Sequence, residues 1–178
     1  METSSQSKVA RTIGLNNGYI FGALYGGYTL VAYLVNLEWF TISWAGTVLF
    51  VLGIVMMILS INTAKKALGG YIGFRDSFTS AFITAFVGSL INTVLTILIF
   101  NVIDRSAAET VVDLLSEKME TMMERLSVPQ DKIDEAIENI GQAFAPATQL
   151  RGFGIGLAFY AAISAVLAAF LKKNKPLE

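Results

Sequence analysis

The side chains whose type and spacing suit chemistry lie in one acidic stretch of the sequence. Glu117, Glu120 and Glu124 recur at helical spacing, which brings three carboxylates toward one side of a helix. Such carboxylates can bind a divalent cation, but a calcium loop places its oxygen atoms at alternate positions around a glycine, and this stretch lacks that pattern. We therefore interpret the three glutamates as a solvated acidic surface and expect no metal site.

The sequence also lacks the residues on which most catalysis depends. It contains no cysteine and no histidine, so it has no disulfide, no thiolate nucleophile, no zinc site of the usual kind and no histidine general base. Its apolar runs hold no paired carboxylates and no Ser–His pair. We predict that the chain is not an enzyme and that it has no catalytic residues and no cofactor.

Charged residues are confined to a few segments of the chain. Only 15% of the residues are charged and 54% are hydrophobic, whereas soluble domains carry about 25% charged residues. Asp, Glu, Lys and Arg are absent from the runs 13–37, 39–62, 77–103 and 152–171. Each run is long enough to cross about 30 Å of hydrocarbon as a helix. The sequence therefore predicts an all-α membrane protein with four transmembrane helices at these positions.

The polar segments complete this organisation: 1–12, 63–76, 104–151 and 172–178. Residues 104–151 carry an excess of acids, and two capping-box patterns, Ser106–Glu109 and Ser127–Gln130, predict the starts of two helices. We expect an acidic helical hairpin between the third and fourth spans. Its large apolar residues should pack on the span ends, and this set is Leu115, Met119, Met122, Ile137 and Ile140.

Two interpretations of the hairpin's methionines stay open. Flexible filling of a core is the default, and a binding groove is the alternative. The candidate interaction surface combines these methionines with the three glutamates, namely Met119, Met122, Met123, Glu117, Glu120 and Glu124.

Small residues recur at spacing four within three of the spans. The first span carries Gly14, Gly18, Gly22 and Gly26, and the third carries a column of Ser, Thr, Gly88 and Asn92. The fourth has alanines that include Ala158 and Ala162. We predict that these positions form close helix–helix contacts in lipid. A polar conduit is the alternative for the third span, but Ser and Thr can satisfy themselves on their own helix.

The basic residues predict the orientation in the membrane. One set lies on the side of both termini, namely Lys8, Arg11, Lys65, Lys66, Arg75, Lys172, Lys173 and Lys175. By the positive-inside rule this side is cytoplasmic, and the acidic hairpin lies outside. We interpret the first span as an uncleaved signal anchor, because it is longer than a signal-peptide core and lacks an A-x-A site. The net charge of −1 hides the segregation of charge along the chain and says little about partners. We expect no nucleic-acid partner.

A family resemblance supports this picture. The order of spans, the run from Lys65 to Phe74 (KKALGGYIGF), the pair Ile103–Asp104 and the ending Lys172–Lys173 resemble the bacterial membrane family called domain of unknown function 4199. The similarity covers nearly the whole chain. Arg75 and Asp76 are an exception, since the family more usually has small and amide residues at these two positions. It implies an inner-membrane protein of a Gram-negative bacterium. It implies no activity and no functional residues.

The function predicted from the sequence is structural or interactive. The hairpin would contact other proteins or the membrane surface on the outer side, and the expected partners are the lipid bilayer, a membrane or periplasmic protein, or another copy of the chain. The alternative is a small transporter or channel subunit that works as an oligomer. Ion coupling is disfavoured, because the spans contain no charged residue.

Overall fold

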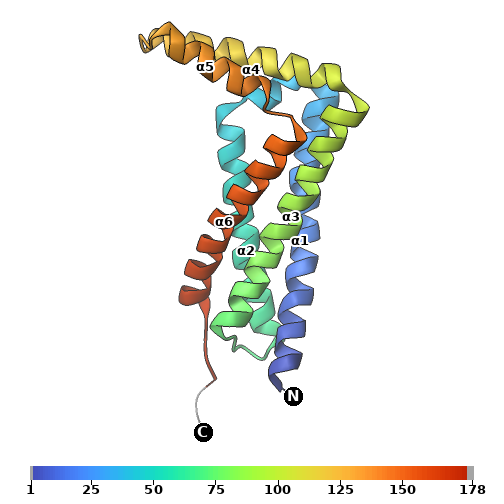
Figure 1. The fold of residues 1–178 in the computed structure, drawn as a ribbon. Coiled ribbons are helices and arrows are strands. Elements are labelled where there is room, and N and C mark those ends of the chain that lie inside the picture. The colour runs from blue at the N-terminus through green and yellow to red at the C-terminus, as the bar shows by residue number, and fades with distance from the viewer. Residues whose placement is uncertain (1, 176–178) are drawn as a thin grey trace.

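The structure is a computed structural model that describes residues 2–175. Its described part is all helical, and four helices are long and apolar enough to cross a membrane, as predicted. These are α1 (Glu2–Val35), α2 (Ser43–Ala67), α3 (Phe74–Leu98) and α6 (Pro146–Leu171). Two further helices, α4 (Arg105–Arg125) and α5 (Gln130–Gly141), lie across one end of the bundle (Figure 1). We call this the hairpin end and the opposite one, where the described chain begins and ends, the termini end.

Several helix boundaries differ from those expected. Helix α1 begins at Glu2, because residues 2–12 contain neither glycine nor proline to stop a helix. The loop expected over 63–76 is shorter, since α2 continues to Ala67. Gly69 and Gly70 then turn the chain with φ angles of 75° and 91°, which favour glycine, and Gly73 precedes α3.

Two short segments shape the hairpin end. The 3-10 helix η1 (Leu37–Thr41) joins α1 to α2, and the π-helix η2 (Ile99–Ile103) prolongs α3. Asp104 then caps α4, because its Oδ1 accepts hydrogen bonds from Ala107 N at 3.0 Å and from the Ser106 hydroxyl at 2.7 Å.

The expected capping boxes are therefore wrong. Asp104, and not Ser106, occupies the N-cap position of α4, because η2 ends only at Ile103 and the helix can restart only there. Helix α5 follows Pro129 without a side-chain cap, since Ser127 is used to turn the chain with a φ of 55°.

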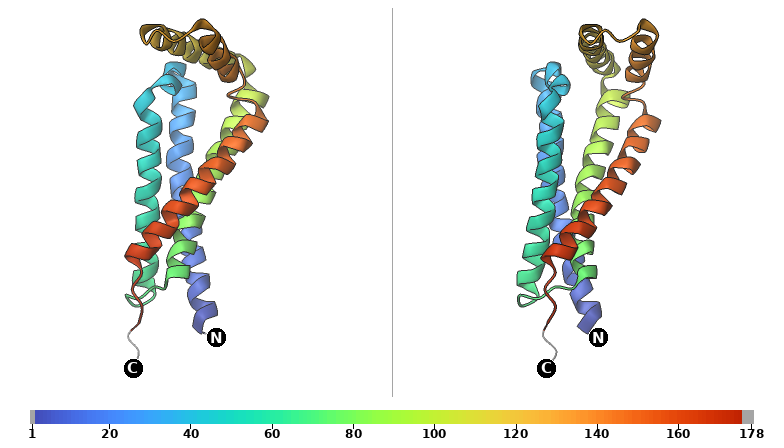
Figure 2. Two further views of the ribbon diagram at one scale, coloured as in Figure 1. Left: turned by 60° about the vertical axis from the view of Figure 1, so that its left-hand side comes forward. Right: turned by 90° about the vertical axis from the view of Figure 1, so that its left-hand side faces the viewer.

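Helices α1 and α3 form the most extensive helix pair, with α2 and α6 beside them. Helix α6 lies near α2 at the termini end and diverges from it toward the hairpin end, as both views of Figure 2 show. At the termini end, Ile72 and Lys173 exchange two backbone hydrogen bonds of 2.9 Å. This backbone pairing holds the end of α6 against the α2–α3 turn.

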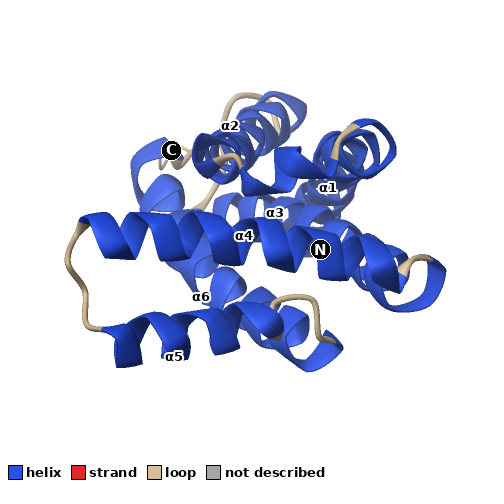
Figure 3. Cartoon of the chain, turned by 90° about the horizontal axis from the view of Figure 1, so that it is seen from above, coloured by secondary structure: helices blue, strands red, loops and turns tan. Residues whose placement is uncertain are grey.

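The first half of α4 packs on the ends of the spans. Ala107 and Val111 are buried with Ile99 and Phe100 of η2. The last turns of α4 and the turn to α5 extend beyond the bundle, which is visible from above in Figure 3. The helices α4 and α5 lie side by side along their length, with Ile133 buried.

Candidate functional site

The glycine row of α1 receives large side chains of α3. A Cβ atom at Gly18 would lie 2.7 Å from Val87 Cβ, and one at Gly22 would lie 3.0 Å from Ile91 Cβ. The same side of α3 meets the other two glycines, through Ser80 O and Ile83 at Gly14 and through Leu95 at Gly26. Only glycine leaves room for this close approach of two helices.

The small-residue column of α3 contacts both neighbouring helices. A Cβ atom at Gly88 would overlap the ring of Phe21 on α1. The Ser80 and Ser60 hydroxyls are 2.6 Å apart and link α3 to α2. The Thr84 hydroxyl donates hydrogen bonds to Gly14 O at 3.2 Å and to Ser80 O within its own helix at 2.9 Å. These polar contacts tie α1 and α2 to α3.

The fourth span uses a different face from the one predicted. Its buried row is Tyr160, Ser164 and Ala168, whereas Ala158 and Ala162 are exposed. The expectation that these two alanines contact another span of the same chain is therefore not met. The row that includes Tyr160 faces the bundle because its ring packs on Phe50 of α2, with ring centroids 5.7 Å apart.

Two adjoining cavities lie in the hairpin-side half of the bundle. The larger has a volume of about 560 Å³ and the smaller about 220 Å³. Tyr25 of α1, Asn92 of α3 and Gln149 of α6 line both cavities. We call the two cavities together the recess. Of its lining residues, Asn92 was singled out from the sequence as a helix-packing residue and Ile140 as an inward-facing residue of the hairpin.

The polar groups of the recess are only partly used within the protein. Asn92 Oδ1 accepts a hydrogen bond of 2.7 Å from the Thr29 hydroxyl, and Gln149 Nε2 donates one of 2.7 Å to Ala143 O. Among the side chains described, those of residues 5–175, the only fully buried polar atom without a partner is Ser77 Oγ. Tyr25 and Tyr160 also line the recess. Donors and acceptors therefore remain available to a ligand.

All four long helices contribute to the recess. The hydroxyl of Tyr160, which lines the larger cavity, lies over Gly53 of α2, where an added Cβ atom would be 2.8 Å away. On its α2 side it is lined by Ala45, Gly46 and Leu49. On its α6 side the larger cavity is lined by Gly152, Phe153 and Gly156, and α6 diverges from α2 toward the hairpin end (Figure 2).

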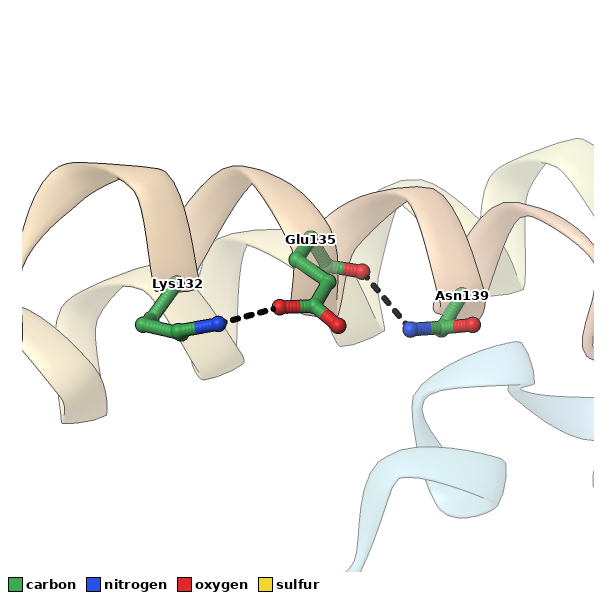
Figure 4. A network of polar contacts seen from close by, with 3 residues as sticks. All are labelled: Lys132, Glu135 and Asn139. Carbon is green, nitrogen blue, oxygen red and sulfur yellow. Dashed lines mark hydrogen bonds and ion pairs between the residues drawn. The ribbon is translucent and has the colours of Figure 1, made fainter.

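The hairpin covers the recess at the membrane surface. Asn139 and Ile140 of α5 line the larger cavity. The Asn139 side chain donates a hydrogen bond of 2.8 Å to Glu135 O, and the Glu135 carboxylate pairs with Lys132 at 2.8 Å (Figure 4). Polar contacts along α5 thus end at the mouth of the recess.

The recess is polar but uncharged. None of the described residues that line its two cavities is Asp, Glu, Lys or Arg. The side chains described for residues 5–175 contain no group of three or more Asp or Glu that could hold a metal ion, and Glu117, Glu120 and Glu124 are exposed on α4. This arrangement suits hydrogen bonding to a neutral group rather than acid–base or metal chemistry.

The predicted interaction surface is divided by the structure. Met119 and Met123 are half-buried toward α5, whereas Met122 is 51% exposed and faces a groove elsewhere on α4. The expectation that Met122 turns inward is therefore wrong, because its side chain lies on the face of α4 that borders this open groove.

Three recess residues had no place among the predicted sites. Tyr25 and Tyr160 lie among small residues in the sequence, and the small residues were singled out instead. Gln149 lies before residues 152–171, the bounds predicted for the fourth span. An amide within a helix that starts at Pro146 is the signal that could have found Gln149.

Comparisons with known proteins supply a family and no function. The model of the family described as Protein of unknown function (DUF4199) matches residues 16–173. No curated protein and no solved structure matches the chain.

Proposed function

The chain belongs to the family described as Protein of unknown function (DUF4199), and we propose that it is a non-enzymatic, multi-pass membrane protein that binds an uncharged amphiphile in the recess. The polar head of the ligand would meet Tyr25, Asn92 and Gln149. Its hydrocarbon part would leave between α2 and α6 into the lipid.

One observation carries the proposal: the side chains of Tyr25, Asn92 and Gln149 come from three helices long and apolar enough to cross a membrane, and all three line both cavities of the recess. Polar groups inside a membrane are costly unless they have partners. Here the Asn92 amide uses its oxygen for Thr29, which leaves its nitrogen as a donor. A ligand with hydroxyl or carbonyl groups would satisfy these side chains.

The class of ligand follows from charge and size. A charged head would be desolvated in the recess without a counter-charge, because the lining lacks ionisable acids and bases. The larger cavity, about 560 Å³, falls within the range of small-molecule sites. A glycerol-like head on one or two acyl chains fits both conditions.

The proposed setting is a bacterial inner membrane, with both termini in the cytoplasm. Lys65, Lys66, Arg75, Lys172 and Lys173 gather at the termini end, and positive charge favours the cytoplasmic side. The hairpin and the mouth of the recess would then face outward. Its acidic surface would be presented to a periplasmic or membrane partner.

A transporter or channel subunit is the second candidate. The exposed row of Gly154, Ala158 and Ala162 on α6 supports it, because small residues at spacing four favour helix association and hence an oligomer. Transport would also require the recess to open past Tyr160 toward the termini end. Binding alone requires no such movement, so it is the simpler function.

Native mass spectrometry of the full chain tests the binding proposal. We expect 1-monooleoylglycerol to remain bound more strongly than lysophosphatidylglycerol, an anionic lipid with the same acyl chain. Asn92→Leu and Gln149→Leu should each weaken retention of monooleoylglycerol. Asn16→Leu makes the same chemical change at an exposed position of α1 and should have no effect. Equal retention by all variants would refute the proposal.

A further inference from the structure

A groove on the outer surface is separate from the recess. It lies between η1 and the second half of α4, has a volume of about 680 Å³, and is open to solvent. The residues that line it are Glu38, Leu114, Glu117, Lys118, Thr121, Met122, Arg125 and Leu126.

The groove is at the level of the lipid headgroups. The first two candidate spans end at Val35 and begin again at Ser43, so Glu38 lies in the short connection at the membrane boundary. Trp44 beside it is 66% exposed, as expected of an aromatic residue at the interface. The Lys118 ammonium donates a hydrogen bond to the Thr41 hydroxyl and fixes α4 across this connection.

The end of α4 beyond this contact extends past the bundle. Helix α4 runs across the top of the spans, and its last turns lie outside them in Figures 1 and 3. With the four apolar helices in a bilayer, the last turns of α4 would lie over the lipid beside the bundle. Met122 and Leu126 are 51% and 69% exposed, which places apolar side chains where acyl chains begin.

Charges of both signs meet at the groove. Glu38 and Glu117 supply two carboxylates, and Lys118 and Arg125 supply an ammonium and a guanidinium. None of the four is in a salt bridge with another described side chain, since Lys132–Glu135 is the one ion pair found among residues 5–175. The remaining acids of α4 are exposed outside the groove, and these are Glu109, Asp113, Glu120 and Glu124.

We infer that this groove binds the headgroup of a zwitterionic phospholipid of the same membrane leaflet. The phosphate would lie against Arg125 and Lys118, because a guanidinium donates paired hydrogen bonds to phosphate oxygens. A primary ammonium would lie against Glu38 and Glu117, and the acyl chains would run past Met122 and Leu126. The mixed charges favour such a headgroup over an anionic one, which the two carboxylates would repel.

The test compares three lipids on the full chain by native mass spectrometry: phosphatidylethanolamine, its trimethylated counterpart phosphatidylcholine, and anionic phosphatidylglycerol. We expect the strongest retention for phosphatidylethanolamine, because trimethylation removes the N–H donors that the carboxylates accept. Glu117→Gln should lower its preference over phosphatidylcholine about two- to five-fold, as is typical of exposed charge pairs. Arg125→Gln should weaken retention of all three lipids.

Two matched controls separate this site from other effects. Glu120→Gln removes a carboxylate on the same helix outside the groove and should leave the lipid preference unchanged. Asn92→Leu alters the recess and should also leave it unchanged. Equal retention of the three lipids by the unaltered protein, or an equal effect of Glu120→Gln and Glu117→Gln, would overturn the inference.

Discussion

The Thr29 hydroxyl on α1 donates a hydrogen bond of 2.7 Å to Asn92 Oδ1 on α3, deep in the membrane-spanning part of the bundle. The bond holds the Asn92 amide in place across the interface of the most extensive helix pair. It also leaves the amide nitrogen on the side of the recess, which Asn92 lines. One side chain thus joins two helices and forms part of the proposed binding surface.

The strength of this bond can be measured with a double-mutant cycle. Thr29→Val and Asn92→Leu should each lower the free energy of unfolding by about 0.6 to 2 kcal/mol, as interhelical hydrogen bonds in membranes usually do. The double variant should lose less than the sum of the two, because both substitutions remove the same bond. Reversible unfolding in detergent provides the measurement. Strict additivity would show that the pair is not coupled.

Substitution within the glycine row should destabilise the α1–α3 pair. In Gly22→Leu the new side chain would meet Ile91, whose Cβ would be 3.0 Å from the added Cβ atom. We expect a loss of about 1 to 3 kcal/mol, which is typical of overpacking, measured as a lower melting temperature in detergent. Gly27→Leu is the matched control, because an added Cβ atom there meets nothing within 4 Å. An equal fall in both variants would contradict the packing explanation.

The cap of α4 predicts a dependence of stability on acid. Hydrogen bonds from the Ser106 hydroxyl, the Ala107 amide and the Tyr33 hydroxyl hold the pKa of Asp104 below its ordinary value of 3.8. The ionised cap therefore stabilises the fold fully above that value, and this contribution is lost as the pH falls through the lower pKa of the folded protein.

Comparison with Asp104→Asn isolates this effect. The variant cannot ionise, so its melting temperature should fall less than that of the unaltered protein when the pH is lowered from neutral to below 3.8. Parallel curves for the two proteins would show that ionisation of Asp104 does not contribute.

The sequence predicts the spans well because the bilayer imposes a strong rule. Uncharged runs of sufficient length mark all four long helices. Helix ends were less accurate: Asp104 displaced the expected cap at Ser106 because the preceding π-helix fixes where α4 starts. Such an effect depends on tertiary packing and leaves no local pattern.

The recess could not be predicted from the sequence, because it depends on how the helices diverge. Tyr25, Asn92 and Gln149 come from three helices and line the same cavity. Their arrangement depends on the direction of α6, which diverges from α2 toward the hairpin end. Packing of the Tyr160 ring on Phe50 of another helix likewise accompanies the inward position of Tyr160 and the outward position of Ala158. Spacing along one helix identifies a small-residue row but does not say which partner, if any, covers it.

The proposed orientation predicts the outcome of a reporter fusion. A reporter active only in the periplasm should be silent when fused after Glu178, because the basic residues at the termini end favour the cytoplasm. The same reporter inserted in the turn after Leu126, which is 69% exposed, should be active. The reverse pattern would invert the topology and place the recess mouth on the cytoplasmic side.

The most direct test of the proposed function is photocrosslinking of the full chain with a monoacylglycerol that carries a diazirine next to its glycerol head. We predict labelling concentrated on the outer halves of α2 and α6, around Gly46, Leu49 and Phe153, and its suppression by excess unlabelled monooleoylglycerol. The exposed residues Leu24 and Val31 of α1, which do not line the recess, should be labelled weakly. Labelling spread evenly over all lipid-facing surfaces, with no competition, would contradict a binding site in the recess.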